Sequence, residues 1–440
     1  MCIRDRFGGT SVGSAQRMKE VAKLITDGEQ KIVVLSAMSG TTNTLVEISD
    51  YLYKKNPEGA NEIINKLEAK YKQHIDELFA TQEYKQKGLE VVKSHFDYIR
   101  SYTKDLFTLF EEKVVLAQGE LISTAMVNFY LQECGVKSVL LPALEFMRTD
   151  KNAEPDPVYI KDKLRAQLDL YPDTEIYITQ GFICRNAYGE IDNLQRGGSD
   201  YTASLIGAAV NASEIQIWTD IDGMHNNDPR IVDKTAPVRQ LHFEEAAELA
   251  YFGAKILHPT CIQPAKYANI PVRLLNTMDP EAPGTLISND TEKGKIKAVA
   301  AKENITAIKI KSSRMLLAHG FLRKVFEIFE SYQTSIDMIC TSEVGVSVTI
   351  DNTKHLNEIL DDLKKYGTVT VDKEMCIICV VGDLEWENVG FEAKALDAMR
   401  NIPVRMISFG GSNYNISFLI RECDKKVALQ SLSDMLFNDK

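Results

Sequence analysis

The sequence lacks the features of a secreted, membrane-spanning or nucleic-acid-binding protein. Its 440 residues include only eight cysteines, scattered and mostly in apolar runs, a usage typical of buried thiols in a reducing cytoplasm. No unbroken apolar run approaches the length of a membrane span, and no secretory signal is visible. A formal net charge of −11 argues against nucleic acid or an anionic membrane as the main partner. We therefore expect a cytoplasmic protein of roughly two to four domains.

Three familiar ligand motifs are also missing. The glycine turn Phe7–Ser14 (FGGTSVGS) precedes a helical pattern, but no Gly-Lys-Ser/Thr follows it and its glycine spacing is not that of a dinucleotide-binding turn. Cys376 and Cys379 form a CxxC inside a strand-like run, where their side chains face opposite sides. No second pair accompanies them, so we expect no zinc and name no metal-ligating residue.

The most informative stretch that is present is Gln195–Ser204 (QRGGSDYTAS). Gly197 and Gly198 let backbone N–H groups approach an anion with no Cβ in the way, and these groups continue into the free donors of a helix N-terminus. Arg196 adds a forked donor for a carboxylate or phosphate. Asp200 would repel such an anion unless a cation or a substrate ammonium lies between them. By itself the stretch is also compatible with a tight turn before an ordinary helix.

Alternating strands and helices over the first 295 residues predict an α/β fold with a mainly parallel sheet. The unbroken apolar run Lys31–Ala37 predicts a buried parallel strand, whereas the first six residues, MCIRDR, lack a strand pattern. Residues 48–113 are charged and helical and predict an insert with a solvated face. Gly119 is expected to break the helical pattern that follows. Further strands are expected at 136–141, 175–179, 214–219 and 271–275, and a helix at 243–254.

From about residue 299 a βαββαβ unit occurs twice, and its second copy lacks a last strand. A sheet missing a strand has an open edge, so we expect a strand shared between the copies or supplied by a partner. The predicted domains are residues 1–295, with the insert at 48–113, then 300–373 and 374–440. Paired small repeats favour regulation rather than chemistry. Strands are expected at 306–311, 335–341, 344–351, 369–373, 376–381, 404–409 and 415–420, with helices at 321–332, 356–366, 391–400 and 425–437.

Eight motifs occur in the order found in aspartokinases, members of the amino acid kinase family: FGGTSVGS, SAMSGTTN, GELIS, QGFI, QRGGSDYTAS, WTDIDG, NDPR and FGAKILHP. The resemblance covers nearly the whole chain from Phe7, and the tail resembles the tandem ACT domains of these enzymes. It implies an amino acid kinase-like sandwich followed by two ACT-like domains. MLLAHGFL and TSEVGVSVTID resemble most the lysine-sensitive, monofunctional members, and the chain ends at Lys440 with no room for a fused dehydrogenase.

The resemblance implies transfer of the γ-phosphoryl group of MgATP to the side-chain carboxylate of L-aspartate, the first step towards lysine, threonine and methionine. ATP and Mg²⁺ are the implied cofactors, and the Mg²⁺ should be coordinated mainly by phosphate oxygens. Arg196 and Ser199 would hold aspartate, and Glu120 would take its ammonium group. The implied substrate residues are Ser36, Thr42, Glu120, Arg196, Gly197, Gly198 and Ser199. The implied nucleotide residues are Arg6, Phe7, Gly8, Gly9, Thr219, Asp220, His225, Arg230, Lys255 and Ile256, and the implied catalytic residues are Arg6, Asp200 and Lys255.

The resemblance also implies lysine as an effector and a homodimer or a dimer of dimers. Gly320 would open a helix whose N–H groups bind the effector carboxylate, and Asp337 would take an ammonium group. The implied regulatory residues are Met315, Gly320, Phe321, Leu322, Ser335, Asp337, Thr341, Ser342 and Glu343.

Three positions depart from the family pattern. Arg6 stands where the family has a lysine before FGGTSV, a substitution that is not conservative. With the poor strand character of MCIRDR, it leads us to expect that the natural start is missing or replaced. His225 stands in place of a tyrosine near the nucleotide, and Ala318 in place of a serine in the effector region.

Two alternatives remain open at this stage. Another amino acid kinase, acting on glutamate or acetylglutamate, is disfavoured by the long helical insert, WTDIDG and the ACT pair. An amino-acid-binding regulatory protein with an impaired kinase half is the alternative of a different class. Replacing Arg6 by lysine would distinguish it from an active kinase.

Overall fold

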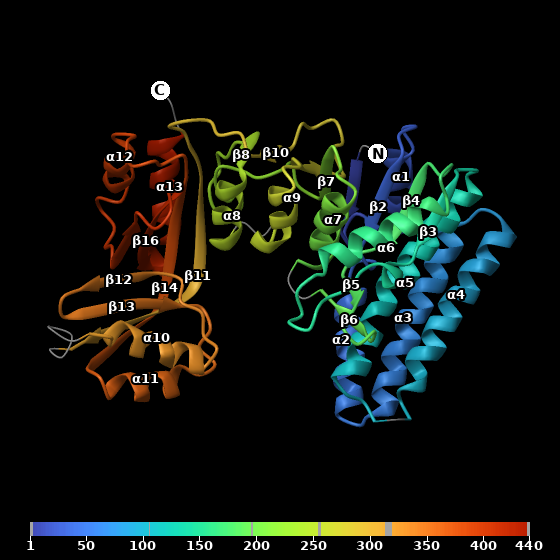
Figure 1. The fold of residues 1–440 in the computed structure, drawn as a ribbon, viewed down its shortest axis with the longest axis horizontal. Coiled ribbons are helices and arrows are strands. Elements are labelled where there is room, and N and C mark those ends of the chain that lie inside the picture. Colours follow the sequence, from blue (N-terminus) through green and yellow to red (C-terminus); the bar gives the residue numbers. More distant parts are fainter. Residues whose placement is uncertain (1–2, 105, 195–196, 254–256, 313–318, 438–440) are drawn as a thin grey trace. The chain divides into compact units, whose positions relative to one another are not determined.

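The computed structural model describes residues 3–104, 106–194, 197–253, 257–312 and 319–437 (Figure 1). The chain forms two compact units. The first unit comprises residues 1–224 and 256–290, and the second unit comprises residues 225–255 and 291–440.

The first unit is built on a twisted sheet whose strands run in the order β3-β4-β2-β1-β7-β9-β10. Neighbouring strands from β3 to β9 are parallel, and β10 pairs antiparallel with β9. All five residues of β2 are buried. This agrees with its parallel pairing on both sides, because helices cover both faces of parallel sheets and leave their strands buried. The predicted α/β fold class is therefore confirmed. The bounds are β1 Ile3–Phe7, β2 Lys31–Leu35, β3 Ser138–Leu141, β4 Ile176–Gln180, β7 Glu214–Thr219, β9 Val272–Asn276 and β10 Thr285–Ser288.

The expectation that the first residues form a poor strand is wrong. Strand β1 lies inside the sheet and pairs in parallel with β2 on one side and β7 on the other, from Ile3 to Phe7. Two neighbouring ladders satisfy its backbone groups, so the tertiary context overrides its weak local pattern. At its carboxyl end, the Phe7 ring stacks on that of Trp218, with 5.6 Å between centroids.

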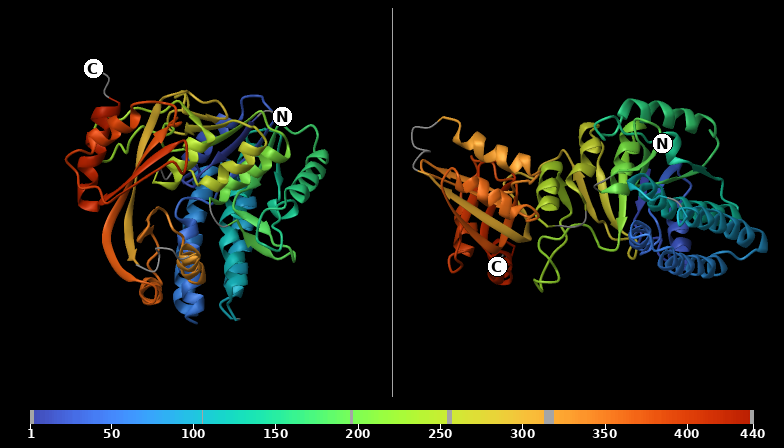
Figure 2. Two further views of the ribbon diagram at one scale, coloured as in Figure 1. Left: turned by 60° about the vertical axis from the view of Figure 1, so that its left-hand side comes forward. Right: turned by 90° about the horizontal axis from the view of Figure 1, so that it is seen from below.

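The helical insert is a group of long helices that run side by side in Figures 1 and 2. Their apolar faces meet in the core that also covers one face of the sheet. Helix α3 begins at Pro57, where proline is tolerated because the first N–H groups of a helix have no intrahelical partner. The helices are α2 Thr41–Tyr53, α3 Pro57–Leu78, α4 Gln82–Ser101 and α5 Leu109–Glu133.

Helix α5 corrects two expectations. Gly119 lies within the helix and does not break it. A Cβ there would lie 2.8 Å from the Cβ of Ala37, so the glycine allows close packing on the loop after β2. Among the described residues, α5 alone is long and apolar enough to cross a membrane by length and composition, although no such run was expected. Of its most apolar stretch, 72% is buried inside the protein. It is apolar all round because helices and strands surround it.

The remaining elements of the first unit lie on or beside the sheet. Helix α7 carries the QRGGSDYTAS motif from residue 198 onward and packs against β1 and β7. The bounds are α1 Ala15–Ile25, α6 Pro157–Asp169, α7 Gly198–Ala209 and α9 Gln263–Tyr267, with a small hairpin of β5 Ile183–Arg185 and β6 Ile191–Asn193.

The second unit contains an antiparallel six-stranded sheet in the order β12-β13-β11-β14-β16-β15. Two of its strands are long, and β14 joins the strands expected at 369–373 and 376–381 into one element. The pairing of β11 with β14 shifts register near Ile305. Asn304 and Glu374 there have φ of 59° and 54°, as local irregularities in a ladder often require. The six strands are β11 Ile296–Lys311, β12 Ile339–Ser342, β13 Gly345–Ile350, β14 Thr368–Gly382, β15 Met406–Phe409 and β16 Asn415–Arg421; the short strand β8 Gln240–His242 lies outside this sheet.

Helices cover this sheet near both ends of the long strands. Helices α10 and α11 lie toward one end and α12 and α13 toward the other (Figure 1), and each pair encloses its own apolar core. Helix α8 packs on β11 and β14. The bounds are α8 Phe243–Tyr251, α10 Phe321–Ser331, α11 Leu356–Lys364, α12 Phe391–Ala398 and α13 Lys425–Leu436.

Candidate active site

The candidate site lies at the carboxyl edge of the parallel sheet in the first unit. Strands β1, β2 and β4 are parallel neighbours, so the loops that follow them meet at one edge, where α/β sheets bind ligands. A cavity of about 460 Å³ opens there, a size suited to a small-molecule ligand. It is lined by Arg6, Gly9, Thr10, Ser36, Ala37, Met38, Ser39, Gly40, Thr42, Asn43, Glu120, Phe182, Gly197, Gly198, Ser199 and Asp200.

Two helices begin at this cavity with a glycine as N-cap. Gly40 precedes α2 with φ of 80°, and Gly197 precedes α7 with φ of 75°. Glycine has no side chain that could cap the first N–H groups. The Thr41 N–H donates to the Met38 carbonyl oxygen and the Asp200 N–H to that of Gly197, so the other first-turn N–H groups are the donors offered to a ligand. Helix α1 differs, because Ser14 caps it by accepting a hydrogen bond from the Arg17 N–H. The cavity therefore has two separate places at which a helix N-terminus can stabilise negative charge.

The glycines also allow a close approach of the loops. A Cβ on Gly197 would lie 1.8 Å from Cys261 Sγ, and a Cβ on Gly9 would lie 3.0 Å from the carbonyl oxygen of Ala37. Glycine is required at position 197 both by its positive φ and by this contact. Gly9 thus lets the loop after β1 pack on the backbone of the loop after β2, and Gly197 lets the start of α7 lie against the Cys261 side chain.

Glu120 is the buried acid of the cavity. It lies on α5, is 3% exposed, and its Oε1 accepts a hydrogen bond of 3.2 Å from the Ala37 N–H. Its Oε2 is buried and has no hydrogen-bond partner among the described residues. Burial raises the pKa of the Glu120 carboxyl to about 8. An ammonium group bound at Oε2 would compensate this buried charge.

Asp200 and Arg6 form an ion pair in the cavity. The Arg6 Nε lies 2.9 Å from Asp200 Oδ1, and their side chains are 17% and 12% exposed. Burial raises the pKa of Asp200, and the Arg6 guanidinium opposes that rise. The arginine also lies against Gly8, because a Cβ there would be 3.0 Å from its Nη1. A cation therefore already lies beside the carboxylate that would otherwise repel an anionic ligand.

Serine side chains tie the cavity walls together. The Ser36 hydroxyl donates a hydrogen bond of 2.8 Å to Ser199 Oγ and so joins the loop after β2 to the start of α7. Ser123 on α5 donates to the carbonyl oxygen of Ser36. The Ala37 N–H donates to Glu120 on the same helix, so α5 holds this loop at two successive residues.

Most of the predicted substrate residues lie together, whereas the predicted nucleotide residues are distributed. Phe7 and Gly8 adjoin the cavity in sequence, Thr219 ends β7, and Asp220 is exposed. Arg196, Lys255 and Ile256 lie outside the described residues. The predicted residues that line the cavity are Arg6, Gly9, Ser36, Thr42, Glu120, Gly197, Gly198, Ser199 and Asp200.

His225 and Arg230 belong to the second unit. His225 Nδ1 lies 3.0 Å from Thr235 Oγ1. Arg230 is largely exposed and donates two hydrogen bonds to the Asp228 carboxylate. Their roles at the nucleotide remain predictions.

Sequence reasoning did not name seven of the lining residues: Thr10, Ala37, Met38, Ser39, Gly40, Asn43 and Phe182. Phe182 has a φ of 69°, which is rare for a bulky side chain and marks a constrained position. Its N–H donates to Thr202 Oγ1, and its ring lies against Gly198. The sequence did contain a signal, since all of these lining residues lie within the motifs quoted above. A single sequence does not, however, show the φ angle of Phe182.

The predicted regulatory residues lie in the second unit, apart from Met315, which falls outside the described residues, as does Ala318. Gly320 caps α10 with φ of 82°, and Phe321 lies in the core beneath that helix. Asp337 precedes β12 rather than lying on a strand, and its side chain is fully buried. The exposed members of the set are Gly320, Leu322, Ser335, Thr341, Ser342 and Glu343.

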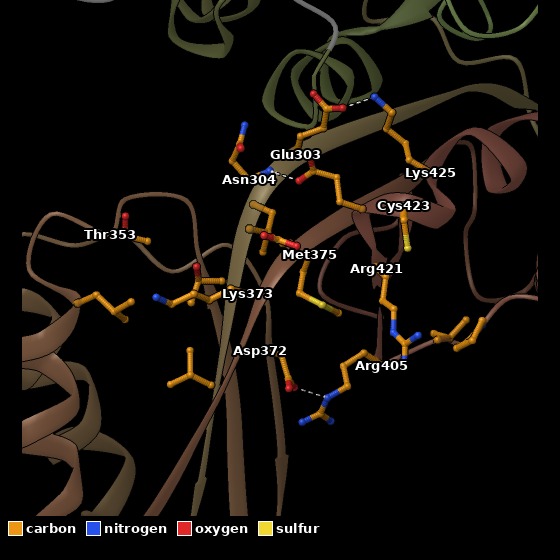
Figure 3. A pocket seen from close by; sticks show the side chains of 18 of the residues that line it. Glu303, Asn304, Thr353, Asp372, Lys373, Met375, Arg405, Arg421, Cys423 and Lys425 are labelled. Atoms are coloured by element: carbon orange, nitrogen blue, oxygen red, sulfur yellow. Dashed lines mark hydrogen bonds and ion pairs between the residues drawn. The ribbon is translucent and has the colours of Figure 1, made fainter.

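The second unit also has a larger hollow, of about 1300 Å³, where the long strands β11 and β14 bend (Figure 3). Acidic and basic side chains line it in equal number, and several pair with each other: Arg405 with Asp372 at 2.8 Å, and Lys425 with Glu303. This balance of charge favours neither an anionic nor a cationic ligand.

Comparison with known proteins identifies the family. The model of the amino acid kinase family matches residues 6–276, and an ACT domain model matches residues 378–436. Aspartokinase 1, chloroplastic, of Arabidopsis thaliana is 35% identical over 460 residues, covering 98% of this chain and 79% of its own. Lysine-sensitive aspartokinase 3 of Escherichia coli is 32% identical over 448 residues, covering 99% of both.

A solved structure agrees with these sequence relatives. The crystal structure of E. coli aspartokinase III in complex with aspartate and ADP superposes with a TM-score of 0.86 and 31% identity, covering all of both chains. Sequence and fold thus agree over the full length of the chain, which belongs to the aspartokinase family of the amino acid kinases.

Proposed function

We propose that this chain is an aspartate kinase that transfers the γ-phosphoryl group of MgATP to the side-chain carboxylate of L-aspartate, giving 4-phospho-L-aspartate. The observation that carries the proposal is the cavity with two glycine-capped helix N-termini and one buried, half-partnered carboxylate. Two anions and one ammonium group would find complementary partners there. The E. coli relative binds aspartate and ADP, which supports the same ligands here.

In this proposal the amino acid lies between α5 and α7. Glu120 receives its ammonium group at Oε2, Arg196 and Ser199 hold its carboxylates, and Ser36, Thr42, Gly197 and Gly198 complete the site. The substrate carboxylate is itself the nucleophile, so no protein nucleophile is needed. Catalysis then consists of positioning two anions and neutralising their repulsion.

The nucleotide phosphates approach from the glycine turn after β1. Gly8 and Gly9 offer backbone N–H groups, and the Arg6 guanidinium, held by Asp200, adds a positive charge next to them. Lys255 would neutralise further phosphate charge, and Phe7, Thr219, Asp220, His225, Arg230 and Ile256 would complete the nucleotide site. Mg²⁺ would bind mainly through phosphate oxygens and water, the ligands it keeps in most kinases.

We further propose that lysine inhibits the enzyme at the tandem repeats and that the enzyme is a cytoplasmic homodimer or a dimer of dimers. A structure of the E. coli relative in complex with lysine and aspartate superposes with a TM-score of 0.82 and 32% identity. Our proposed domain bounds are residues 1–295 for catalysis and 300–373 and 374–440 for the two repeats. Lysine can inhibit only by binding an inactive arrangement more tightly than the active one.

The test is hydroxamate trapping of the acyl phosphate with ATP, Mg²⁺ and aspartate, glutamate or carbamate offered in turn. We expect a hydroxamate with aspartate only. A product with glutamate alone would assign the chain to another amino acid kinase activity. If none of the three reacts, and replacing Arg6 by lysine creates activity with aspartate, the alternative of a regulatory protein with an impaired kinase half describes the molecule.

A further inference from the structure

In the second unit, the Asp337 carboxylate is already occupied by a cation of the same chain. Lys302 Nζ on β11 lies 2.6 Å from Asp337 Oδ1, and the Tyr251 hydroxyl at the end of α8 donates to that same oxygen at 2.8 Å. The ammonium group also lies 4.3 Å from the centre of the Tyr251 ring, a cation–π contact. The Asp337 side chain is 0% exposed and that of Lys302 is 17% exposed.

The other oxygen of this carboxylate is unused. Asp337 Oδ2 is buried and has no hydrogen-bond partner among the described residues. Burial raises the pKa of Asp337, and Lys302 opposes that rise. A second ammonium group would be attracted to Oδ2, but it would lie close to the Lys302 ammonium group in a poorly solvated place, where the two like charges repel each other. An incoming ammonium group and that of Lys302 therefore compete.

Lys302 has a second carboxylate within reach. Its Nζ lies 2.9 Å from Asp351 Oδ2, directly after β13, and the Asp351 side chain is 43% exposed. If the lysine leaves Asp337, Asp351 and solvent can still stabilise its charge. Displacement by a ligand is therefore far less costly than removal of a singly paired buried lysine would be.

The same carboxylate is linked to the segment that carries the FGAK motif. Tyr251 immediately precedes that motif, and Phe252 packs edge-on against its ring. Gly253 has a φ of 123°, and a Cβ there would lie 2.2 Å from the carbonyl oxygen of Ala301, the neighbour of Lys302. Any ligand that takes Asp337 away from Tyr251 and Lys302 thus acts on the strand and the segment just before Lys255.

We propose that the Lys302 ammonium group is a built-in competitor for the effector's ammonium group at Asp337. An effector binds by displacing Lys302 from Asp337, which leaves the lysine paired with Asp351 alone, and by freeing the Tyr251 hydroxyl. The inference rests on the proposed function, in which Asp337 takes the ammonium group of lysine. It adds that competition between Lys302 and the effector sets the affinity for the effector. It also adds that release of the Tyr251 hydroxyl carries the effect of binding to the FGAK segment.

The test measures lysine binding to the full-length protein by calorimetry, with inhibition of the kinase reaction in parallel. If Lys302 holds Asp337 in about nine molecules of ten, Lys302→Met should bind lysine about tenfold more tightly. Lys302→Arg, which keeps the charge, should bind close to the unmodified protein. Lys297→Met is the matched control, because Lys297 lies on the same strand and is also buried and paired with a carboxylate, that of Glu292. It should leave the affinity unchanged.

Thermal unfolding provides a second measurement if Lys302→Met folds poorly. Added lysine should raise the unfolding temperature of this variant more than that of the unmodified protein, because it restores the missing cation. Tyr251→Phe should still bind lysine, but saturating lysine should leave more residual kinase activity than in the unmodified enzyme. Full inhibition of Tyr251→Phe would overturn the role given to the hydroxyl.

Asp337→Asn separates the two levels of the proposal. If it loses lysine binding while Lys302→Met binds lysine no more tightly than the unmodified protein, the effector site stands and the internal competitor is ruled out. If Asp337→Asn binds lysine normally, the effector site itself is misplaced and the competitor fails with it. Lysine binding that appears only in Lys302→Met would support the competitor directly.

Discussion

At the scale of single residues, the chemistry of the candidate site depends on Glu120 and on its unusual burial. A carboxyl group with a pKa raised to about 8 is mostly protonated at neutral pH, yet it must be ionised to receive a substrate ammonium group. Binding of aspartate therefore has to release a proton below that pH. This makes the apparent affinity for the amino acid depend on pH in a defined direction.

We predict that the KM for aspartate falls by up to about tenfold per pH unit as the pH rises toward 8, and then levels off. Glu120→Gln should raise KM about 10- to 100-fold, because a charged hydrogen bond is lost, and should remove the pH dependence. Steady-state kinetics across pH check both effects. Glu112→Gln, on the same helix, is the control and should keep the normal profile. A pH-dependent KM that persists in Glu120→Gln would assign the titration to another group.

Arg6 stands where the family resemblance implies a lysine. Its ion pair with Asp200 keeps a positive charge beside the glycine turn, so the change from lysine to arginine preserves the charge but alters its shape. We predict that Arg6→Met lowers kcat about 100- to 1000-fold, as expected for loss of a group that stabilises transferring charge. Arg6→Lys should retain or raise kcat. Hydroxamate assays of both variants check this, and normal turnover in Arg6→Met would exclude Arg6 from the reaction.

Sequence motifs predicted which side chains gather at the site but not how the backbone holds them. Glu120 could be named from its motif, whereas its unpartnered oxygen and its bond to the Ala37 N–H depend on the packing of α5 against a distant loop. The same holds for Lys302 and Asp337, which are far apart in sequence. Their pairing arises from the sheet, and no local pattern records it.

At the scale of elements, the start of α7 combines a helix N-terminus with a glycine that no other residue can replace. Ala at position 197 would face both an unfavourable φ and a contact of 1.8 Å with Cys261 Sγ. Gly189 has a similar φ of 84° but open space around it. Substitutions at the two glycines therefore distinguish the effect of backbone strain alone from that of strain combined with a steric collision.

We predict that Gly197→Ala lowers kcat/KM at least about 100-fold by shifting the first turn of α7. Gly189→Ala should cost only about 1–2 kcal/mol of stability, from its left-handed backbone, and leave the kinetics unchanged. Adding Cys261→Ala to Gly197→Ala removes the sulfur and leaves contacts of 3.1 Å with the His258 Cβ and 3.6 Å with the Cβ at position 261, so activity should partly return. Steady-state kinetics and thermal unfolding of the three variants measure the loss of activity and the loss of stability separately. Equal losses in both glycine variants would show that strain alone acts.

Elements were predictable where one face of the chain is apolar and unpredictable where tertiary pairing decides. The buried run of β2 and the amphipathic helix α10 were found close to their true bounds. Strand β1 was not, because its stability comes from two parallel neighbours rather than from its own residues. Gly119 was interpreted as a helix break, yet the close contact of α5 with Ala37 requires a glycine inside that helix.

At the scale of the whole molecule, the two repeats are joined by the strands β11 and β14, each of which takes part in both apolar cores of the second unit. The sequence periodicity showed the repeat and led us to expect a strand shared between the copies or supplied by a partner, but not that two long strands continue through both copies. The sheet still ends in the short strands β12 and β15, which approach each other where Cys340 Sγ lies 3.2 Å from the Ile407 carbonyl oxygen. Ile339, Ile407 and Phe409 are partly exposed on these edges.

Exposed apolar side chains on edge strands favour association with another chain. We therefore predict a particle with about twice the chain mass of 49.4 kDa, or a multiple of it, in sedimentation velocity. Ile339→Lys on β12 places a charge on the edge that carries Thr341 and Ser342, and it should shift the particle toward the mass of one chain. Val389→Lys, at a residue 94% exposed outside the edge strands, should leave the mass unchanged. Since lysine is proposed to bind beside this edge, Ile339→Lys should also weaken inhibition. A single-chain mass for the unmodified protein, with lysine inhibition intact, would show that one chain holds the whole effector site.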